Sequence, residues 1–162
     1  MTKSAQVQVL SVIRHAEAGD RERFVGDDSL RPLTRQGRRQ SNALAKRLSD
    51  FTLDLITSPY LRCVETISPT SARLRRAMML ASWLVEGEPA DEALYQLVEL
   101  TGEIGGLVAC THQDVMVGMV DVALTAGAIP SSEPNFEKAA TAELTIVSGK
   151  VVAVSFVAPP KI

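Results

Sequence analysis

The sequence predicts an α/β fold of three layers, in which a mostly parallel central sheet lies between helices on both faces. Apolar segments typical of strands alternate with amphipathic segments typical of helices along residues 9–126. Residues 9–13 form an apolar run of the kind found in parallel strands that are buried on both faces. Two more apolar runs, at residues 142–147 and 151–156, are separated by three residues, which predicts a C-terminal antiparallel hairpin.

The composition is that of one globular domain, which we place at residues 1–162. Hydrophobic residues make up 46% of the chain and charged residues 22%, with a formal net charge of −2. This balance gives no positive field for nucleic acid, and no apolar segment reaches the ~18 residues that a membrane span requires. Cys63 and Cys110 stand in no CxxC spacing, so we expect neither a disulfide framework nor a cysteine-based zinc site. We expect a cytoplasmic protein without a signal peptide, and the sequence does not predict its oligomeric state.

The first helix is predicted to begin after Thr34, which is a suitable N-cap. Leu44, Ala45 and Leu48 recur at helical spacing, and the basic residues of this segment are read as its solvated face. Residues 19–33, between the first strand and this helix, carry charges, glycines and a proline without an apolar period. They predict a loop, for which a solvated surface loop is the favoured interpretation.

The second strand is predicted at residues 53–57, followed by a helix that runs to about residue 76. We expect Ser58 to cap this helix and Pro59 to occupy its first position. Arg62 then falls in the first turn, where the positive end of the helix dipole disfavours a cation. Arg62 therefore needs an anionic partner, and Glu65 and Glu17 are the candidates.

The remaining elements alternate in the same way. Residues 77–84 are read as a third strand, with a helix as the open alternative, and residues 91–100 as a helix. A buried strand at 106–110 and a helix at 114–126 follow, and then a loop at 127–138 that contains two prolines.

Cationic side chains follow three of the predicted strands. Arg14 and His15 end the first, Arg62 lies shortly after the second, and His112 follows the strand at 106–110. Ligands of open α/β sheets bind beyond the carboxyl ends of the strands, so these side chains meet in one pocket if the strands are neighbours. Guanidinium groups suit phosphoryl oxygens, and an imidazole can act as a nucleophile. We expect no metal, because two histidines without a third ligand, beside arginines, make a poor zinc site.

Arg14-His15-Ala16 resembles the RHG/RHA signature of the histidine phosphatase superfamily, whose fold is the phosphoglycerate mutase-like fold. Three more segments resemble the family in the same order. Residues 30–37 are similar to its "RPLT..G" segment, residues 57–66 to "SSP..R..(E/Q)T", and residues 110–112 to "(S/T/G)H". The short chain resembles the SixA-like branch of small phosphohistidine phosphatases. Residues 23–28 with 110–112 also look like the phosphatase-like domain found fused behind Nudix hydrolases.

The resemblance implies roles for five residues. His15 would be the nucleophile that becomes phosphohistidine, and Arg14 and Arg62 would bind the phosphoryl oxygens. His112 would hydrogen-bond the transferring group and stabilise its charge. Arg31 matches an arginine of the small branch that also lies near the phosphate.

Three further positions lie in or beside the segments that resemble the family. Glu86 lies in a segment similar to "L.EG", which carries the general acid of the family, and a solvated loop glutamate is the competing interpretation. Ala16 replaces the glycine of many members, a change that the small branch tolerates. Cys63 is interpreted as a small buried hydrophobic residue, and the sequence does not decide whether it has a redox role.

The expected function is a phosphatase that needs no cofactor and works through a phosphohistidine on His15. The substrate is either phosphohistidine on a protein or a nucleotide-derived or other small phosphomonoester. A non-catalytic phosphate-binding module is the alternative from another class, and the chain is too short for the insertions of the larger mutases. A compact chain with few inserted segments predicts a shallow pocket, which favours the protein-borne substrate. Neither nucleic acid nor a membrane is an expected partner.

Overall fold

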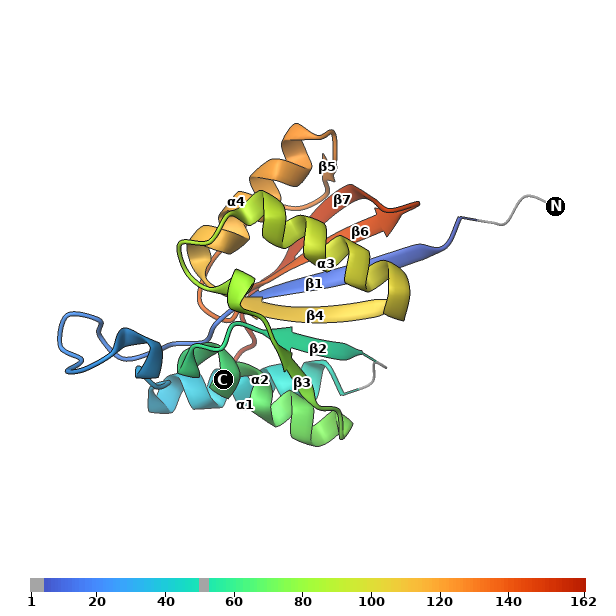
Figure 1. The fold of residues 1–162 in the computed structure, drawn as a ribbon. Helices are drawn as coiled ribbons and strands as arrows, with labels where there is room; N and C mark the ends of the chain where they lie inside the picture. Colours follow the sequence, from blue (N-terminus) through green and yellow to red (C-terminus); the bar gives the residue numbers. More distant parts are fainter. Residues whose placement is uncertain (1–4, 50–52) are drawn as a thin grey trace.

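A single sheet forms the centre of the computed structural model, which describes residues 5–49 and 53–162 (Figure 1). Its strand order is β3-β2-β4-β1-β6-β7-β5. The strands are β1 (Val7–Arg14), β2 (Asp54–Thr57), β3 (Met78–Leu80), β4 (Gly106–Thr111), β5 (Ile129–Pro130), β6 (Thr141–Val147) and β7 (Lys150–Val157).

The sheet is parallel through its first four strands and antiparallel around β6. The pairs β3–β2, β2–β4 and β4–β1 are parallel, whereas β6 is antiparallel to both β1 and β7. The β6–β7 connection turns at Ser148 and Gly149, which both have positive φ. The predicted parallel sheet with a C-terminal hairpin is therefore confirmed.

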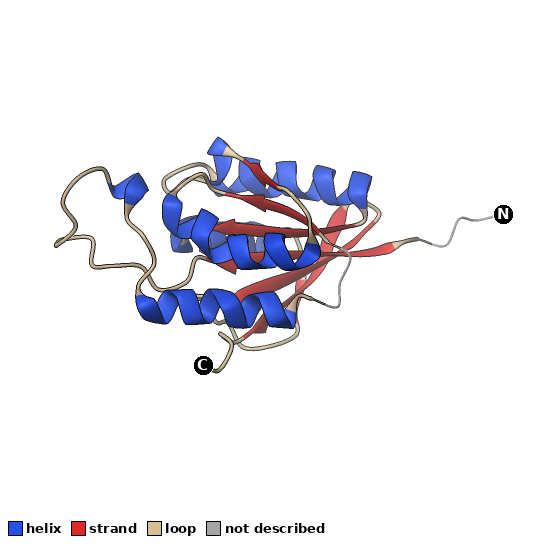
Figure 2. Cartoon of the chain, turned by 90° about the horizontal axis from the view of Figure 1, so that it is seen from below, coloured by secondary structure: helices blue, strands red, loops and turns tan. Residues whose placement is uncertain are grey.

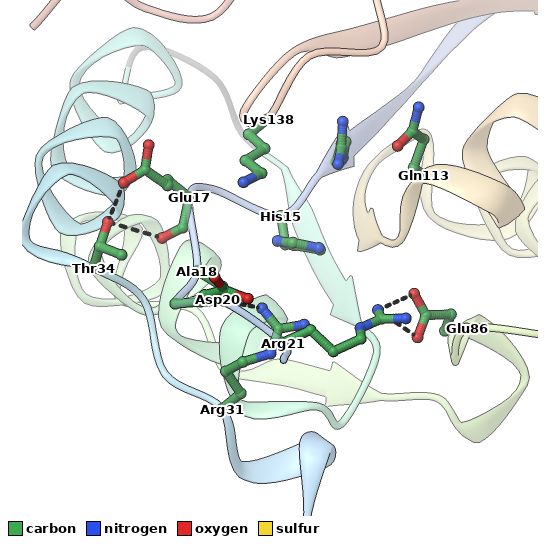
Figure 3. A pocket seen from close by; sticks show the side chains of 12 residues that line it. His15, Glu17, Ala18, Asp20, Arg21, Arg31, Thr34, Glu86, Gln113 and Lys138 are labelled. Atoms are coloured by element: carbon green, nitrogen blue, oxygen red, sulfur yellow. Dashed lines mark hydrogen bonds and ion pairs between the residues drawn. The ribbon is translucent and has the colours of Figure 1, made fainter. Parts of the chain in front are cut away.

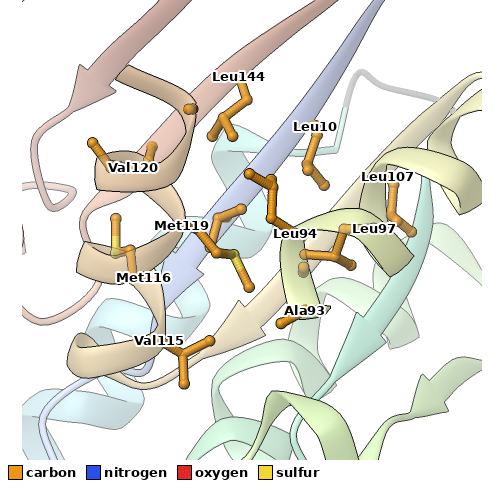
Figure 4. Close-up of a cluster of buried hydrophobic side chains, with 14 of the residues drawn as sticks. Leu10, Ala93, Leu94, Leu97, Leu107, Val115, Met116, Met119, Val120 and Leu144 are labelled. Carbon is orange, nitrogen blue, oxygen red and sulfur yellow. The ribbon is translucent and has the colours of Figure 1, made fainter. Parts of the chain in front are cut away.

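Two pairs of helices cover the sheet, one pair on each face (Figure 2). The pair α1 (Arg35–Arg47) and α2 (Leu61–Leu74) packs on one face, and the pair α3 (Ala90–Ile104) and α4 (Gln113–Thr125) packs on the other. Each face has its own cluster of buried hydrophobic residues, and Figure 4 shows the larger one, in which Leu94 and Met119 meet Leu10 of β1. Burial on both faces explains why the sequence of β1 is apolar without alternation.

The first helix forms where the sequence predicts it. The Thr34 hydroxyl accepts a hydrogen bond from the Gly37 N–H, as expected of an N-cap. Leu44, Ala45 and Leu48 are all buried against the sheet and α2. The apolar stripe thus fixes which face of α1 points inward.

Three local predictions need correction. Residues 77–84 form a strand only at β3, because the chain then turns into a short 3-10 helix, η2 (Ser82–Leu84), that buries Leu84. The second helix starts at Leu61 with Tyr60 as N-cap, since the Ser58 hydroxyl is engaged with His112 at 2.9 Å. The loop at 127–138 contains β5, a two-residue strand on the edge beside β7 that is too short to show a period.

No helix in residues 5–49 or 53–162 has the length and apolar character needed to cross a membrane.

Gly37 is required by a close approach between α1 and the chain after β1. A Cβ atom at this position would lie 1.9 Å from the Glu17 carbonyl oxygen, which is backbone and cannot rotate away. We expect Gly37→Ala to lower the free energy of unfolding by about 1–3 kcal/mol, because the two segments must separate. Urea denaturation measures this change.

Gly102→Ala is the matched control. Gly102 also lies in a helix, and a Cβ atom there has no heavy atom within 4 Å. Alanine should raise the free energy of unfolding by up to about 1 kcal/mol through its helix propensity. Equal effects of the two substitutions would contradict the close approach.

Candidate active site

The three strand-end motifs lie at one edge of the sheet because β2, β4 and β1 are adjacent and parallel. Arg14 pairs with Thr111 in register, and the His15 N–H donates to the Thr111 carbonyl at 3.0 Å. The rings of His15 and His112 have centroids 5.5 Å apart. The structure therefore brings both histidines together, because the strands that precede them, β1 and β4, are neighbours.

His15 is held as a neutral imidazole with a defined tautomer. Its Nδ1 lies 2.8 Å from the Ala16 carbonyl oxygen, which can only accept, so Nδ1 carries the proton and Nε2 has the free lone pair. Burial lowers the pKa of His15 to about 3, and the charges of Arg62 and Arg14 act in the same direction. The side chain is 7% exposed. Its geometry is that of a nucleophile that needs no deprotonation at neutral pH.

His112 is fully buried and forms the N-cap residue of α4. Its Nε2 lies 2.9 Å from the Ser58 hydroxyl, which also accepts the Tyr60 N–H. We assign the Ser58 hydroxyl as the donor to His112 Nε2, which leaves the proton of the His112 ring on Nδ1. Nδ1 has no hydrogen-bond partner within the described chain, so it is a donor for a bound anion.

Arg62 lies in the first turn of α2, and its side chain is completely buried. Its Nη1 donates to the Asp28 carbonyl at 2.9 Å, and its guanidinium lies 4.9 Å from the centre of the Tyr60 ring. Its Nη2 lies 3.2 Å from an Asp28 oxygen and 3.5 Å from a Glu86 oxygen. The expected anionic partner therefore exists.

The identity of that partner differs from both sequence candidates. Glu65 accepts the Leu33 N–H, and Glu17 accepts the Thr34 hydroxyl. The prediction was wrong because Glu65 and Glu17 both hydrogen-bond to the two residues that lie just before α1. The carboxylates that reach Arg62 come from other segments.

Arg14 and Arg31 are fixed mainly by backbone carbonyls. Arg14 Nη1 donates to the Phe136 carbonyl at 2.7 Å, and Arg31 Nη1 donates to the Gly19 carbonyl. Arg31 Nε donates to the Asp28 carboxylate at 2.8 Å. Half-burial lowers the pKa of Arg14 through desolvation. Both arginines line the same cleft as His15.

Buried N–H groups without a partner gather in this small region. In residues 5–49 and 53–162, six buried side-chain polar atoms lack a hydrogen bond, and four of them belong to three residues of the site. These four are Arg14 Nε, Arg62 Nε, Arg62 Nη2 and His112 Nδ1. Because buried polar groups are almost always paired, such a concentration of donors indicates a binding site for an anion.

The cleft at His15 has a volume of about 700 Å³ (Figure 3). Residues 17–21 and Arg31 form one part of its lining, and Glu86, Gln113 and Lys138 complete it. Residues 19–33 extend beyond the carboxyl ends of the strands (blue in Figure 1). The interpretation of this segment as a solvated surface loop holds for residues 20–27, which are mostly exposed, but not for its last part, where Arg31 is buried and the Asp28 carboxylate contacts Arg62.

Glu86 lies at the site but is already paired. The guanidinium of Arg21 donates two hydrogen bonds to its carboxylate, at 2.7 and 2.9 Å, across the cleft (Figure 3). The structure therefore places Glu86 at the cleft with the other site residues, in an ion pair whose two side chains are both partly exposed.

Four further residues of the site carried no usable signal in the sequence. Asp28, Arg21 and Lys138 stand in segments without periodicity, and Ser58 was assigned to helix capping. Of the first three residues, only Asp28 lies in a segment with a family resemblance, since residues 23–28 look like the phosphatase-like domain fused behind Nudix hydrolases.

The two cysteines lie beneath the site. Cys63 and Cys110 are both fully buried and free, and Cys63 Sγ lies 3.6 Å from His112 Nε2. The interpretation of Cys63 as a small buried residue is confirmed. Within the described part of the chain, no group of three or more histidine, cysteine, aspartate or glutamate side chains could hold a metal ion.

The fold thus brings two histidines and several arginines together in one site that suits an anion. Residues 10–89 match the family model of the histidine phosphatase superfamily (branch 1), and the chain belongs to this superfamily. Its sheet and helices form the phosphoglycerate mutase-like fold that the motifs predict.

Comparisons with individual proteins agree on the fold. The protein histidine phosphatase SixA in complex with tungstate shares it at a TM-score of 0.70 and 22% identity, over 94% of this chain and 96% of that one. A SixA protein from Nakamurella multipartitia shares it at a TM-score of 0.76 and 21% identity, over 97% and 99% of the two chains.

A curated relative is more similar in sequence. The 8-oxo-(d)GTP phosphatase of Mycolicibacterium smegmatis is 29% identical in an alignment of 162 positions that covers 98% of this chain and 50% of that protein. The chain therefore spans about half the length of this relative.

The lowered pKa of His15 predicts a pH dependence of stability. Between about pH 6.5 and the folded pKa of about 3, the unfolded chain binds a proton that the folded protein excludes. The free energy of unfolding therefore falls as the pH drops through this window. We expect His15→Gln to remove this contribution and to reduce the slope by up to about 1.4 kcal/mol per pH unit. Urea denaturation at several pH values tests this, and equal slopes in both proteins would contradict a buried neutral imidazole.

Proposed function

We propose that this protein is a phosphatase that needs no cofactor and transfers a phosphoryl group to His15 before hydrolysis. The observation that carries this proposal is the set of four unpaired buried N–H groups beside the free Nε2 of His15. Membership of the histidine phosphatase superfamily supports it. Arg14 and Arg62 would bind the phosphoryl oxygens, and His112 Nδ1 would donate to the oxygen on which charge accumulates.

The reaction has two balanced steps. In the first, the lone pair of His15 Nε2 attacks phosphorus, the N–P bond forms, and the bond to the leaving group breaks with its electron pair. In the second, water attacks phosphorus, the N–P bond breaks, and its electron pair returns to Nε2. Inorganic phosphate leaves, and the water proton passes to solvent. The arginines need not move between the two steps, because the same three oxygens stay bound throughout.

Phosphohistidine on a protein is the substrate that we propose. An alkoxide leaving group needs a general acid, whereas the imidazole of phosphohistidine leaves easily. Glu86, the candidate acid, accepts two hydrogen bonds from Arg21. This pairing favours a substrate that requires no proton from the protein.

A small nucleotide-derived phosphate is the second candidate. The observation in its favour is the similarity to the 8-oxo-(d)GTP phosphatase, which extends over 98% of this chain. A cleft of about 700 Å³ also has room for more than a phosphoryl group. Turnover of a phosphohistidine peptide and of a nucleotide panel, compared as kcat/KM, decides between the two substrates.

The covalent intermediate is the first prediction to test. The wild-type protein is mixed with a ³²P-labelled phosphoryl donor, quenched in alkali and digested. We expect a label that is stable to alkali, labile to acid and located on the peptide that contains His15. His15→Ala should lose the label and at least about 99% of turnover, since such nucleophiles contribute several kcal/mol to lowering the barrier.

Two outcomes would contradict the covalent mechanism. His15→Ala with residual turnover above about a hundredth of the wild-type rate excludes a nucleophilic role. Tight phosphate binding without any label or turnover, from all donors tried, would instead favour the non-catalytic binding module. Circular dichroism of the variant confirms that its fold is intact.

The role of Glu86 predicts a dependence on the leaving group. We expect kcat for a phosphohistidine peptide to exceed kcat for an alkyl phosphomonoester by about a hundredfold or more, because no acid protonates the alkoxide. Glu86→Gln should change this ratio by less than about threefold. A ratio that rises about tenfold or more in Glu86→Gln would show that Glu86 does act as the acid for the ester.

A further inference from the structure

Asp28 brings a negative charge onto the arginines of the proposed phosphoryl site. This residue begins the 3-10 helix η1 (Asp28–Leu30) in the loop after β1. One carboxylate oxygen lies 3.2 Å from Arg62 Nη2, and the other lies 2.8 Å from Arg31 Nε. The side chain is 36% exposed, so it reaches a fully buried guanidinium from the solvent side of the site.

The contact between Asp28 and Arg62 is an ion pair without a well-aligned hydrogen bond. Arg62 Nη2 remains an unpaired buried donor although the carboxylate oxygen is only 3.2 Å away. Its N–H bonds therefore do not point at Asp28 and stay available to another acceptor. A phosphoryl oxygen bound there would lie close to the Asp28 carboxylate, and the two anions would repel each other.

We infer that Asp28 competes with the phosphoryl group for Arg62 and Arg31 and thereby lowers the affinity of the site for phosphate. The inference rests on the proposed function for the identity of the ligand. The competition would act on the last step of the reaction, the release of inorganic phosphate. Inorganic phosphate must leave a site built from buried donors, and a carboxylate that returns to the same guanidinium groups favours its departure.

The arginines keep their places without the Asp28 carboxylate. Arg62 is held by the Asp28 backbone carbonyl and by the face of Tyr60. Arg31 has a second hydrogen bond to the Gly19 carbonyl. A competitor is therefore a better description of the Asp28 side chain than a support for the arginines.

The charge of Asp28 is present at neutral pH. The hydrogen bond from Arg31, together with the charges of Arg62 and Arg21, holds the pKa of the Asp28 carboxyl below its ordinary value. The other carboxylate near Arg62 is Glu86, which lies 3.5 Å away and is engaged by Arg21. Asp28 is thus the ionised group that lies nearest to Arg62 among the described residues.

Asp28→Asn tests the inference with little change of shape. Asparagine keeps an oxygen that can accept the Arg31 N–H and removes only the charge. Binding of inorganic phosphate is measured by calorimetry at neutral pH and fixed ionic strength. We expect the Kd for phosphate to fall about tenfold or more, and KM to fall in the same direction.

Asp27→Asn is the matched control. Asp27 is the neighbouring residue with the same charge, and its side chain caps η1 by accepting the Ser29 N–H at 2.9 Å. Asparagine caps equally well, so the turn is preserved while one negative charge is lost. Its Kd for phosphate should stay within about threefold of the wild-type value. Equal tightening in both variants would attribute the effect to net charge and overturn the inference.

An unchanged or weaker affinity in Asp28→Asn would also overturn it and make Asp28 a positioning residue for the arginines. Asp28→Ala gives the same test if the asparagine variant fails to fold, as judged by circular dichroism. The binding measurement needs no turnover, so its outcome is independent of the proposed function. Tighter binding by Asp28→Asn without any phosphoenzyme would preserve this inference and reject the covalent mechanism.

Discussion

The burial of a guanidinium at the carboxyl ends of the strands is the constraint on which the site depends. Arg62 is fully removed from solvent, and a buried charge is strongly unfavourable unless other groups pair with it. Within the described chain, its partners come from two segments outside the sheet, Asp28 of the long loop and Glu86 of the turn before α3. Both carboxylates offset part of the free-energy cost of burying this charge.

The same burial prepares the chemistry of His15. Removal from water favours the neutral imidazole, and the Ala16 carbonyl selects the tautomer in which Nε2 is free. A cationic His15 would also be repelled by Arg14 and Arg62, so the arginines proposed to bind the phosphoryl group add to the effect of burial on the proposed nucleophile. Affinity for an anion and nucleophilicity thus arise from one arrangement of charges, without a metal ion in the proposed mechanism.

Carboxylates among these cations limit how tightly the site holds an anion. Four donors remain unpaired, but Asp28 and Glu86 both lie within 3.5 Å of Arg62 Nη2. A site with only cations would bind phosphate well and release it slowly. The hydrogen bonds between Glu86 and Arg21 support the proposal of a substrate that needs no proton from the protein.

The sequence by itself determined the layers of the fold and the four residues at the strand ends. Apolar runs and helical periods are local properties, and Arg14, His15, Arg62 and His112 follow directly from where those runs end. Only the tertiary structure decided which carboxylates meet the arginines. Asp28 reaches Arg62 across 34 residues and Arg21 reaches Glu86 across 65, from segments that have no period to predict their position. Such contacts depend on how the loop packs against the folded sheet, and no local sequence pattern predicts that packing.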